Sequence, residues 1–353
     1  KIYKMKISIL LPYKENFSSQ YAGAVSLFLK DTISISKFKK KIKIFGSTNY
    51  KKDLLKQNYI NLSVKKLFFE SRSNKYLKNF LNYEEEKKSD IIEVHNRPRY
   101  INKLYKYNKN LVLYYHNDPL ALKESETVND RLNLIKKTKK IIFISKWVKK
   151  RFMIGLRNIK LSSNQFEIIQ HCTSKKKINI KNKKKIILFV GRLNKSKGYD
   201  VFGKSVINIL NNFKDWKSIV IGDEPREKIF FKHKNLKVLG FQNHSNVSKW
   251  FVKSDICVVC SRWEEPFGRT ALEASSSGCA VIITNRGGLI EASPKSLKIK
   301  SLTVKNLENT IKKLVKNENL KRSLQKKIYN NFYLSNFYIA KKIDNYRSGL
   351  TKF

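Results

Sequence analysis

Residues 185–203 read KIILFVGRLNKSKGYDVFG and contain one complete structural unit. The apolar run KIILFV is typical of a buried strand, and Gly191 after it permits a tight turn. A helical pattern begins after Gly198, so the stretch predicts a strand, a loop and a helix in succession. Units of this kind, repeated along a chain, build a parallel sheet with helices on both faces.

The same alternation of short apolar runs and amphipathic segments continues on either side of this stretch. Runs typical of strands are KISILLPY, KIKIFG, DIIEVH, NLVLYYH, KIIFIS and FEIIQH before it, and KSIVIGD, LKVLGF, DICVVC and AVIITN after it. The pattern therefore predicts an α/β protein made of doubly wound, Rossmann-like domains.

A chain of 353 residues is longer than one hydrophobic core usually organises, so we expect two domains. The charged segment KKKINIKNKKK, at residues 175–185, is predicted to be a linker without a core. We expect an N-terminal domain over residues 1–174 and a second domain over residues 175–335, facing each other across a cleft. Residues 336–353 are expected to form a helix that packs back on the first domain. Ligands of such sheets bind beyond the carboxyl ends of the strands.

The composition is strongly basic, with a formal net charge of +48. Three explanations stay open: a coding bias toward lysine in an AT-rich genome, an anionic membrane surface as partner, or nucleic acid. Nucleic acid is the least favoured, because the sequence lacks arginine-rich clusters interleaved with aromatic residues. No apolar run is long enough to span a bilayer, so we expect a cytoplasmic protein that is at most peripheral on the inner membrane face.

The four cysteines are Cys172, Cys257, Cys260 and Cys279. Cys257 and Cys260 have C-x-x-C spacing, but they lie in the apolar run DICVVC, where side chains three positions apart point to opposite faces of a strand. No second Cys or Cys/His pair completes a zinc site. We therefore expect buried thiols and no bound metal.

A second informative stretch is SRWEEPFGRTALEASSSGCAVIITNRGG at residues 261–288, in which Glu265 and Glu273 are eight positions apart. Pro266 suits a first helical position, so we predict that a helix begins there. Its first turn would consist of Phe267, Gly268, Arg269 and Thr270. Backbone donors of such a turn, with the positive end of the helix dipole, attract phosphate. Glu273 would lie roughly 12 Å beyond Glu265, near the distance from sugar to ribose in a nucleotide sugar.

The loop after the strand at residues 185–190 supplies cations for the same ligand. Arg192 can donate two hydrogen bonds to phosphate oxygens, and Lys197 can act as a point charge. Two cations and one helix N-terminus suit a departing diphosphate. For Lys197, an ordinary surface position in a lysine-rich protein is the alternative interpretation.

Three segments of the second half resemble the donor-binding half of the retaining GT-B glycosyltransferases of family 4. These segments are FVGRLNKSKGYDVFGKSV, VIGDEP and SRWEEPFGRTALEASSSGCAVIITNRGG. The family pattern is a Gly-Arg…Lys-Gly loop followed by Glu-x7-Glu, and the likeness extends over residues 186–295. Where relatives usually have Pro-Ser, this chain has Cys260-Ser261.

The resemblance implies a role for each residue of these motifs. Arg192 and Lys197 would hold the donor diphosphate in place of a metal ion, with Gly191 at the turn before them. Glu265 would contact the sugar hydroxyls and Glu273 the ribose hydroxyls.

The remaining parts of the implied donor site are loops. Backbone amides of residues 267–270 would complete the phosphate site. Gly287 and Gly288 would let the next loop approach the donor, although a plain turn explains them as well.

The first half of the chain resembles the family less closely. Gly23 follows the first strand, where the family brings a Gly-containing loop against the donor. His116, in LVLYYHNDP, stands at a strand end where many relatives have a histidine that contacts the donor sugar; a structural histidine is the alternative. His95, in EVHNRPRY, is a weaker candidate for the acceptor side. The cations of SKWVKKRF are candidates for contact with a membrane.

The resemblance implies a retaining hexosyltransferase that moves a sugar from a UDP- or GDP-sugar to a glycan or lipid-linked acceptor. Cell-envelope polysaccharide or lipopolysaccharide biosynthesis is the expected setting, without a metal cofactor. The family is thought to use same-face attack assisted by the leaving phosphate, so Glu265 would position the sugar rather than act as a nucleophile. A phosphorylase or epimerase on the same architecture, and a basic nucleic-acid-binding protein, stay open as alternatives.

Overall fold

The computed structural model describes residues 5–51, 53–62, 64, 70–157 and 159–350. The chain forms two compact units: unit 1 comprises residues 1–172 and 336–353, and unit 2 comprises residues 173–335. Each unit has its own parallel sheet and its own apolar core, so each is described by itself.

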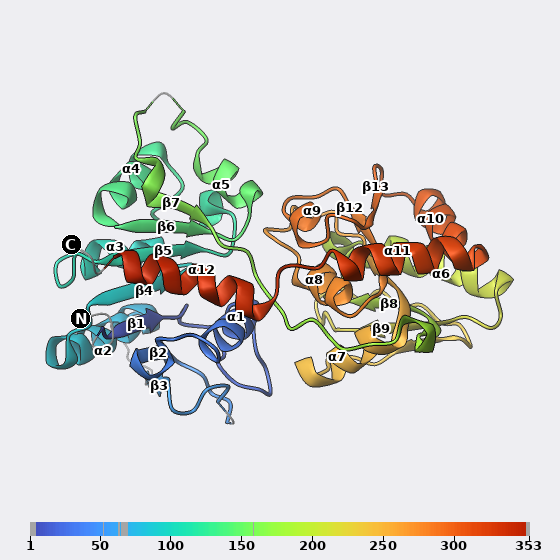
Figure 1. Ribbon diagram of the computed structural model, residues 1–353, viewed down its shortest axis with the longest axis horizontal. Helices are drawn as coiled ribbons and strands as arrows, with labels where there is room; N and C mark the ends of the chain where they lie inside the picture. The colour runs from blue at the N-terminus through green and yellow to red at the C-terminus, as the bar shows by residue number, and fades with distance from the viewer. Residues whose placement is uncertain (1–4, 52, 63, 65–69, 158, 351–353) are drawn as a thin grey trace. The chain divides into compact units, whose positions relative to one another are not determined.

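Unit 1 is built on a seven-stranded parallel sheet in the order β3-β2-β1-β4-β5-β6-β7 (Figure 1). Its strands are β1 (Ile7–Leu10), β2 (Ile42–Gly46), β3 (Tyr59–Asn61), β4 (Ile91–His95), β5 (Leu111–Tyr115), β6 (Lys140–Phe143) and β7 (Phe166–Ile168). Because β1 lies between β2 and β4, the strand order reverses there, as in other doubly wound sheets.

Helices flank this sheet, and the last of them comes from the end of the chain. The helices of unit 1 are α1 (Ala24–Ile33), α2 (Arg72–Lys87), α3 (Ile101–Leu104), α4 (Val128–Lys137), α5 (Lys146–Phe152) and α12 (Asn336–Gly349). Helix α12 packs beside α1. The Asp344 carboxylate on α12 accepts hydrogen bonds from the Ser36 hydroxyl (2.6 Å) and the Lys37 amide (2.9 Å). The Arg347 guanidinium forms a buried, two-bond ion pair with Glu93 of β4 (2.8 and 2.7 Å).

Unit 2 contains a six-stranded parallel sheet in the order β10-β9-β8-β11-β12-β13. Its strands are β8 (Lys184–Val190), β9 (Lys217–Ile221), β10 (Leu236–Val238), β11 (Ser254–Val259), β12 (Ala280–Thr284) and β13 (Leu297–Ile299). The strand order reverses between β8 and β11, so the loops that follow these two strands are neighbours at the carboxyl edge of the sheet.

The helices of unit 2 are α6 (Tyr199–Asn212), α7 (His244–Lys253), α8 (Arg269–Ser276), α9 (Leu289–Ala292), α10 (Val304–Lys316) and α11 (Glu318–Asn330). A buried charge anchors α11 to the sheet. Asp255 of β11 accepts from Lys321 Nζ (2.8 Å) and from Arg322 Nη1 (2.9 Å). Because Asp255 is wholly buried, the two cations supply the charge compensation that burial demands.

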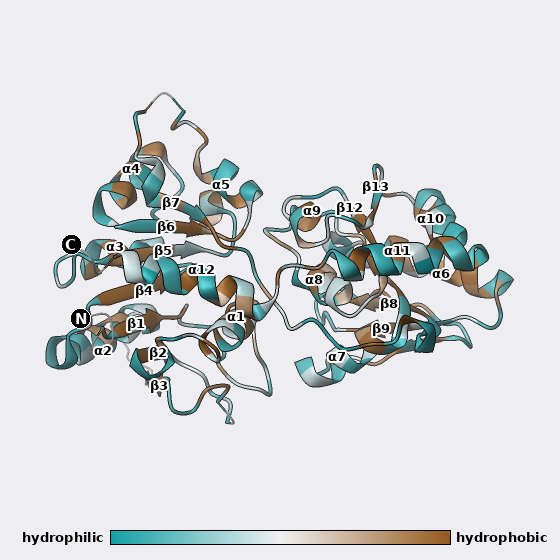
Figure 2. Ribbon diagram, in the orientation of Figure 1, coloured by the Kyte–Doolittle hydropathy of each residue, from teal (hydrophilic) through white to brown (hydrophobic). Residues whose placement is uncertain are grey.

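Each of the eleven apolar runs contains a strand in the structure, so the predicted α/β fold of two doubly wound domains is confirmed. Two strands were not predicted, β3 and β13. Each is three residues long and lies at the edge of its sheet, and its mixed burial gives no apolar run for a pattern to detect. Figure 2 shows apolar residues concentrated on the strands and polar residues on the outer surfaces of the helices.

The prediction that residues 175–185 form a linker without a core is wrong, because this segment belongs to unit 2. Lys183 is buried, and its Nζ donates to the carbonyls of Phe251 and Ser254, both at 2.9 Å, where α7 ends. A cation there satisfies carbonyls that the helix leaves unpaired. Charge in the sequence does not distinguish such a buried lysine from its solvated neighbours.

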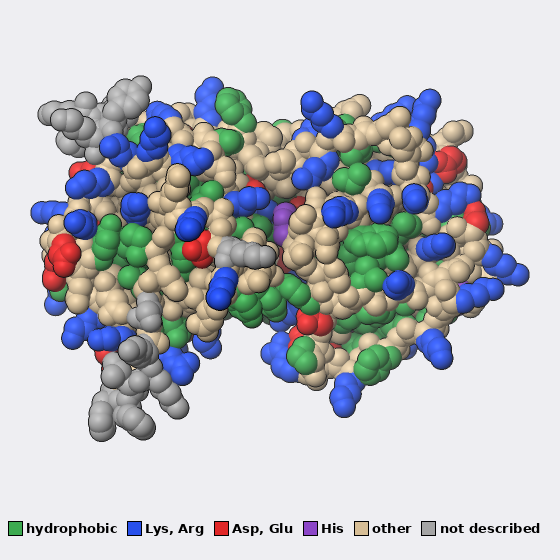
Figure 3. All heavy atoms as spheres, turned by 90° about the horizontal axis from the view of Figure 1, so that it is seen from below, with side chains coloured by type: hydrophobic (Ala, Val, Ile, Leu, Met, Phe, Trp, Pro, Cys, Tyr) green, Lys and Arg blue, Asp and Glu red, His purple; other side chains and the backbone are tan. Residues whose placement is uncertain are grey.

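Basic side chains are distributed over both units rather than gathered on one of them. On the face drawn in Figure 3, Lys and Arg side chains are scattered across the surface with few acidic ones between them. Such a distribution is compatible with a lysine-biased composition. Among the described residues, no helix is long and apolar enough to cross a membrane.

Candidate functional site

Most of the residues predicted to bind the donor lie at the carboxyl edge of the unit 2 sheet, on the loops that follow β8 and β11. The β8 loop (residues 191–198) and the β11 loop (residues 260–268) hydrogen-bond to each other. The backbone amides of Arg262 and Trp263 both donate to the Ser196 carbonyl, at 2.9 and 3.1 Å. The two loops are therefore fixed together at the point where the strand order reverses.

The structure brings Lys197 and Glu265 together. Lys197 Nζ donates to a carboxylate oxygen of Glu265, and the two side chains are 23% and 12% exposed. The motif predicts Lys197 at the diphosphate and Glu265 at the sugar hydroxyls. In the structure each is the charge partner of the other, so a ligand that reaches this point meets a preformed ion pair.

Arg192 differs from Lys197 in having no such partner. Its side chain is exposed, and within the described residues it makes no hydrogen bond or ion pair. Gly191 precedes it in the loop, and its amide bonds the Ile221 carbonyl of β9 at 3.0 Å. The Arg192 guanidinium is therefore available to an anionic ligand at this edge.

The predicted start of the next helix is wrong by three residues. Helix α8 begins at Arg269, and its N-cap is Gly268 in a left-handed conformation (φ 101°). A Cβ atom at Gly268 would lie 2.3 Å from the Leu289 side chain, so the position accepts little but glycine. Pro266 and Phe267 therefore lie in the loop before the helix. Glu273 is about one turn into α8, rather than about two helical turns beyond a Glu265 at the helix cap.

Glu273 is held by two partners, one of which no motif in the sequence predicts. Its Oε1 accepts from Arg269 Nε (2.6 Å) and lies 2.9 Å from His244 Nε2. Burial raises the pKa of Glu273, but Arg269 and His244 outweigh it, and the net pKa is lowered. Glu273 is thus an oriented carboxylate, and Arg269, predicted in the phosphate site, supports it. No local signal marks His244, because it comes from α7.

The last predicted residue of this turn, Thr270, is tied to the end of β8. Its Oγ1 donates to the Val190 carbonyl at 3.4 Å, so the beginning of α8 lies against the β8 loop. The predicted phosphate site of residues 267–270 therefore consists of two loop residues and the first two residues of α8, rather than a complete helical turn.

A third loop follows β12, and Glu264 and the two glycines of that loop fix it against the β11 loop. The Gly287 amide donates to a Glu264 carboxylate oxygen (2.6 Å), and Arg286 Nη1 donates to the other (2.9 Å). A Cβ atom at Gly287, which has a φ of 54°, would lie 2.2 Å from the Glu265 carbonyl oxygen. The close approach that requires Gly287 is therefore made to the Glu265 backbone, and the Gly288 amide also donates to that carbonyl (2.6 Å).

In unit 1, His116 lies within a buried row of three histidines. Its Nε2 is 2.8 Å from His95 Nδ1, and its Nδ1 is 2.9 Å from His171 Nε2. Burial lowers the pKa of His95 to about 3 and lowers that of His116 as well. Both ring nitrogens of His116 are thus occupied by other histidines in this structure, and the predicted contact with the donor sugar stays a prediction.

Gly23 is the N-cap of α1, and a glutamate occupies the space beside it. The Glu15 carboxylate accepts from the amide and the hydroxyl of Ser26, both at 2.9 Å, and a Cβ at Gly23 would lie 2.3 Å from the same oxygen. Burial raises the pKa of Glu15 despite these bonds. In this structure Glu15 therefore fills the anion position at the start of α1.

The cysteines are buried thiols, as expected: all four are buried and none is in a disulfide. Burial raises the pKa of Cys257, and it raises that of Cys260 to about 12. In the part of the chain that the structure describes, no group of three or more His, Cys, Asp or Glu side chains could hold a metal ion.

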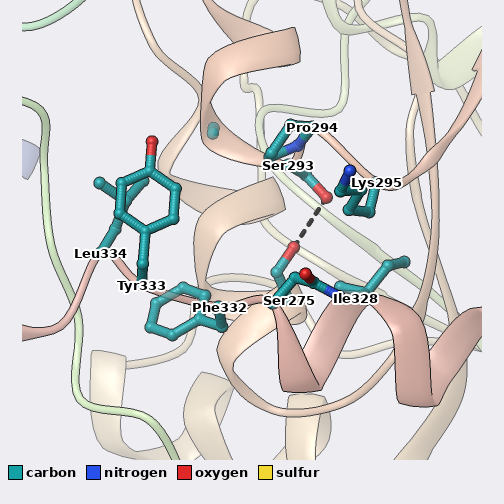
Figure 4. A pocket seen from close by; sticks show the side chains of 10 residues that line it. Ser275, Ser293, Pro294, Lys295, Ile328, Phe332, Tyr333 and Leu334 are labelled. Carbon is teal, nitrogen blue, oxygen red and sulfur yellow. Dashed lines mark hydrogen bonds between the residues drawn. The ribbon is translucent and has the colours of Figure 1, made fainter.

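A small cavity in unit 2 is not large enough for a sugar. It lies between the ends of α8 and α11, with Ser275 hydrogen-bonded to Ser293 (2.8 Å) across it and with Phe332, Tyr333 and Leu334 on its other side (Figure 4). Its volume is about 20 Å³, enough for about one water molecule.

Comparison with known proteins gives a family match in the second half of the chain. Residues 172–331 match the family model described as Glycosyl transferases group 1. The chain is 28% identical to YtcC of Bacillus subtilis over 232 residues, which is 56% of each protein. It is 31% identical to the lipopolysaccharide core biosynthesis mannosyltransferase LpsB of Rhizobium meliloti over 128 residues, 33% of this chain and 36% of LpsB. The chain thus spans little more than half the length of YtcC and about a third of LpsB.

Solved structures match over nearly the whole chain. Anabaena HepE in complex with UDP and glucose has a TM-score of 0.72 at 14% identity, covering 98% of this chain and 99% of that one. WaaG, a glycosyltransferase involved in lipopolysaccharide biosynthesis, has a TM-score of 0.68 at 16% identity, covering 97% and 100%. At such identities the likeness concerns the fold, and the predicted GT-B fold is confirmed.

Proposed function

We propose that this protein is a retaining glycosyltransferase that transfers a sugar from a nucleoside-diphosphate sugar to an acceptor. The observation that carries the proposal is the pair of joined loops at the strand reversal of unit 2, where Arg192, Lys197 and Glu265 lie within the segment that matches Glycosyl transferases group 1. HepE, which has the same fold, binds UDP and glucose, and this supports a UDP-sugar or a related donor.

In the proposed mechanism the cations of the β8 loop stabilise the diphosphate as it leaves. Arg192 is open to solvent and can bind phosphate oxygens with two hydrogen bonds. Lys197 is held beside Glu265, so it is already placed before the donor arrives. Preorganised charge of this kind costs no reorganisation when negative charge develops on the leaving group. No metal ion is required in this scheme.

Glu265 and Glu273 position the two ends of the donor in this proposal. Glu265 contacts the sugar hydroxyls and exchanges part of its interaction with Lys197 for them. Glu273, oriented by Arg269 and His244, accepts hydrogen bonds from the ribose hydroxyls. The transferred sugar keeps its configuration by same-face attack assisted by the leaving phosphate, and Glu265 forms no covalent bond.

The names of LpsB and WaaG favour an acceptor in cell-envelope polysaccharide or lipopolysaccharide assembly, bound by unit 1 at the inner membrane face. A glycan or a lipid-linked glycan is the expected acceptor. The basic surface of the chain would attract an anionic leaflet.

A thermal-shift screen against UDP-, GDP-, ADP- and dTDP-sugars tests the donor part of the proposal. We expect one nucleotide to raise the unfolding temperature of the parent, and Glu273→Ala to abolish most of that shift. Glu308→Ala, an acidic position on α10 remote from the loops, is the matched control and should keep the full shift. Equal shifts in parent and Glu273→Ala would contradict the ribose assignment. Turnover that needs inorganic phosphate but no nucleotide would indicate a phosphorylase instead.

A further inference from the structure

A cavity of about 320 Å³ lies at the carboxyl edge of the unit 1 sheet, within the size range of ligand sites. Its wall is formed by residues that follow β1, β4 and β5, together with Ser73 of α2. Four of its lining residues are cations, Lys14, Arg97, Arg99 and Lys123, and none of its described lining residues is acidic. We call this cavity the basic pocket.

The backbone and the aromatic residues around the pocket hold its two arginines in place. Asn96, the residue after β4, has a left-handed conformation (φ 56°), and Arg97 Nη1 donates to its carbonyl at 2.8 Å. The Arg99 guanidinium lies 5.7 Å from the centre of the Tyr100 ring, whose hydroxyl is 2.7 Å from Ser73 Oγ. Both arginines therefore extend from short, well-anchored segments rather than from a long loop.

Neither arginine is neutralised by a carboxylate at ion-pair distance within the described residues. Of the thirteen arginines, seven form ion pairs with acidic side chains among the described residues: Arg151, Arg226, Arg262, Arg269, Arg286, Arg322 and Arg347. Arg97 and Arg99 resemble Arg192 instead, the cation that we assign to the donor diphosphate. Two acids lie near the pocket lining without an ion pair to either arginine. Glu15 binds Ser26 (2.9 Å) and interacts with Arg97 only at longer range, and Glu124, in the adjoining cavity, accepts from Asn102 (2.8 Å).

A lysine-rich composition does not explain this cluster. Thirteen of the 75 basic residues are arginines, so a bias toward lysine does not account for two arginines in one pocket. A guanidinium matches the geometry of phosphate oxygens through two parallel N–H donors, whereas an ammonium contributes a point charge. Two guanidinium groups and two ammonium groups around one cavity suit a dianionic phosphate better than a single carboxylate.

We propose that the basic pocket binds a phosphate group carried by the acceptor. Arg97 and Arg99 bind its oxygens, and Lys14 and Lys123 supply further positive potential at the rim. The inference rests on the proposed function in one respect: the phosphate-bearing ligand is an acceptor only if the protein transfers a sugar to it. The phosphate can belong to a soluble sugar phosphate or to a lipid head group, and the chemistry of recognition is the same for both.

Isothermal titration of the whole protein with inorganic phosphate and with glucose 1-phosphate tests the pocket. We expect Arg97→Gln/Arg99→Gln to weaken both affinities by about tenfold or more, because charge-assisted hydrogen bonds are lost. Arg99→Lys should retain part of the affinity. The matched control is Lys39→Ala/Lys40→Ala, which removes two exposed charges just before β2, at the opposite edge of the sheet. Equal phosphate affinity in the parent and the arginine variant would overturn the proposal, as would the absence of phosphate binding to the parent.

Lys14→Gln/Lys123→Gln changes two exposed side chains and provides a second test if the arginine variant does not fold. We expect it to weaken phosphate binding several-fold, and an unchanged affinity would count against the pocket. Co-sedimentation with phosphatidylcholine vesicles containing phosphatidic acid distinguishes the sources. Binding to these vesicles that Arg97→Gln/Arg99→Gln abolishes assigns the phosphate to a lipid, whereas binding of glucose 1-phosphate alone assigns it to a soluble sugar phosphate.

A UDP and GDP titration of the same variants separates this inference from the proposed function. The pocket variants should bind nucleotide like the parent, because the donor residues lie in unit 2. If the parent binds neither nucleotide, the proposed function fails while the phosphate titration still decides the pocket. If nucleotide affinity falls together with phosphate affinity, phosphate is binding at the donor site and the basic pocket is refuted.

Discussion

The carboxyl edges of the two sheets carry different arrangements of charge. In unit 2 the cations are mostly paired within the site, as in Lys197 with Glu265 and Arg269 with Glu273. In unit 1 the edge has buried histidines with lowered pKa values and the cations of the basic pocket, which form no ion pair with the residues that the structure describes. Paired charges hold loops in position, and in the proposed mechanism a ligand with both hydroxyl and phosphate groups replaces part of the pairing. Unpaired cations produce a positive potential that suits an anion alone.

The largest expected effect tests whether the two units are energetically separate. Arg347→Ala should destabilise unit 1 by about 3–5 kcal/mol, because it leaves the buried Glu93 carboxylate without its cation. Calorimetric unfolding should show an earlier transition for unit 1 and an unchanged one for unit 2. Lys341→Ala, an exposed position on the same helix, is the control. A shift of both transitions together would show that the units do not unfold independently.

The second largest expected effect concerns two cations of the β8 loop, Arg192, which is unpaired among the described residues, and the paired Lys197. Arg192→Ala and Lys197→Ala should each lower the rate of sugar transfer by about 10²–10³, the range measured when one preorganised donor to a developing charge is removed. Steady-state turnover with the donor found in the thermal-shift screen measures this. Lys195→Ala removes an exposed cation from the same loop and should have little effect. If Lys195→Ala is as damaging as the others, loop charge in general, rather than two placed cations, is responsible.

The buried histidines make unit 1 the more acid-sensitive unit. His95 and His116 have lower pKa values folded than unfolded, so the unfolded chain binds more protons and stability falls as the pH drops below about 6.5. For each buried histidine the expected slope is about 1.4 kcal/mol per pH unit, continuing toward pH 3 for His95. In unit 2, the lowered pKa of Glu273 reduces stability only when the pH falls below 4.5, the ordinary pKa of a glutamate. Unfolding followed between pH 7 and 5 should therefore move the unit 1 transition first, and equal slopes would contradict this.

The smallest expected effect concerns His244, which positions Glu273. His244→Ala removes one hydrogen bond to the carboxylate, and a loss of about 1 kcal/mol, or roughly fivefold in nucleotide affinity, is expected. His233→Ala, which changes a half-buried histidine of the same unit, is the control. Because His244 acts through Glu273, the substitution should have little further effect in a Glu273→Ala background. Additive losses in the double variant would assign His244 a direct contact with the nucleotide.

Much of the fold could be predicted from periodicity alone, because apolar runs and helical intervals are local properties of the chain. The edge strands β3 and β13 escaped this pattern since three residues of mixed burial give no periodic signal. The linker prediction failed at Lys183, whose burial depends on the carbonyls of α7 and not on its neighbours in sequence. The start of α8 was misplaced because Pro266 is compatible with a helix, whereas the Leu289 side chain requires the left-handed Gly268.

The candidate site, like the fold, has features that local sequence predicts and features that depend on tertiary structure. The sequence by itself predicted which residues bind the donor, since the Gly-Arg…Lys-Gly loop and Glu-x7-Glu are contiguous motifs of unit 2. The tertiary structure decided which of them are neighbours, because Lys197 and Glu265 meet only where β8 lies beside β11. It also brought His244 to Glu273 and gathered Lys14, Arg97, Arg99 and Lys123 around one cavity. Motifs are local in sequence, whereas contacts between loops depend on the strand order of the sheet, and no local pattern contains that information.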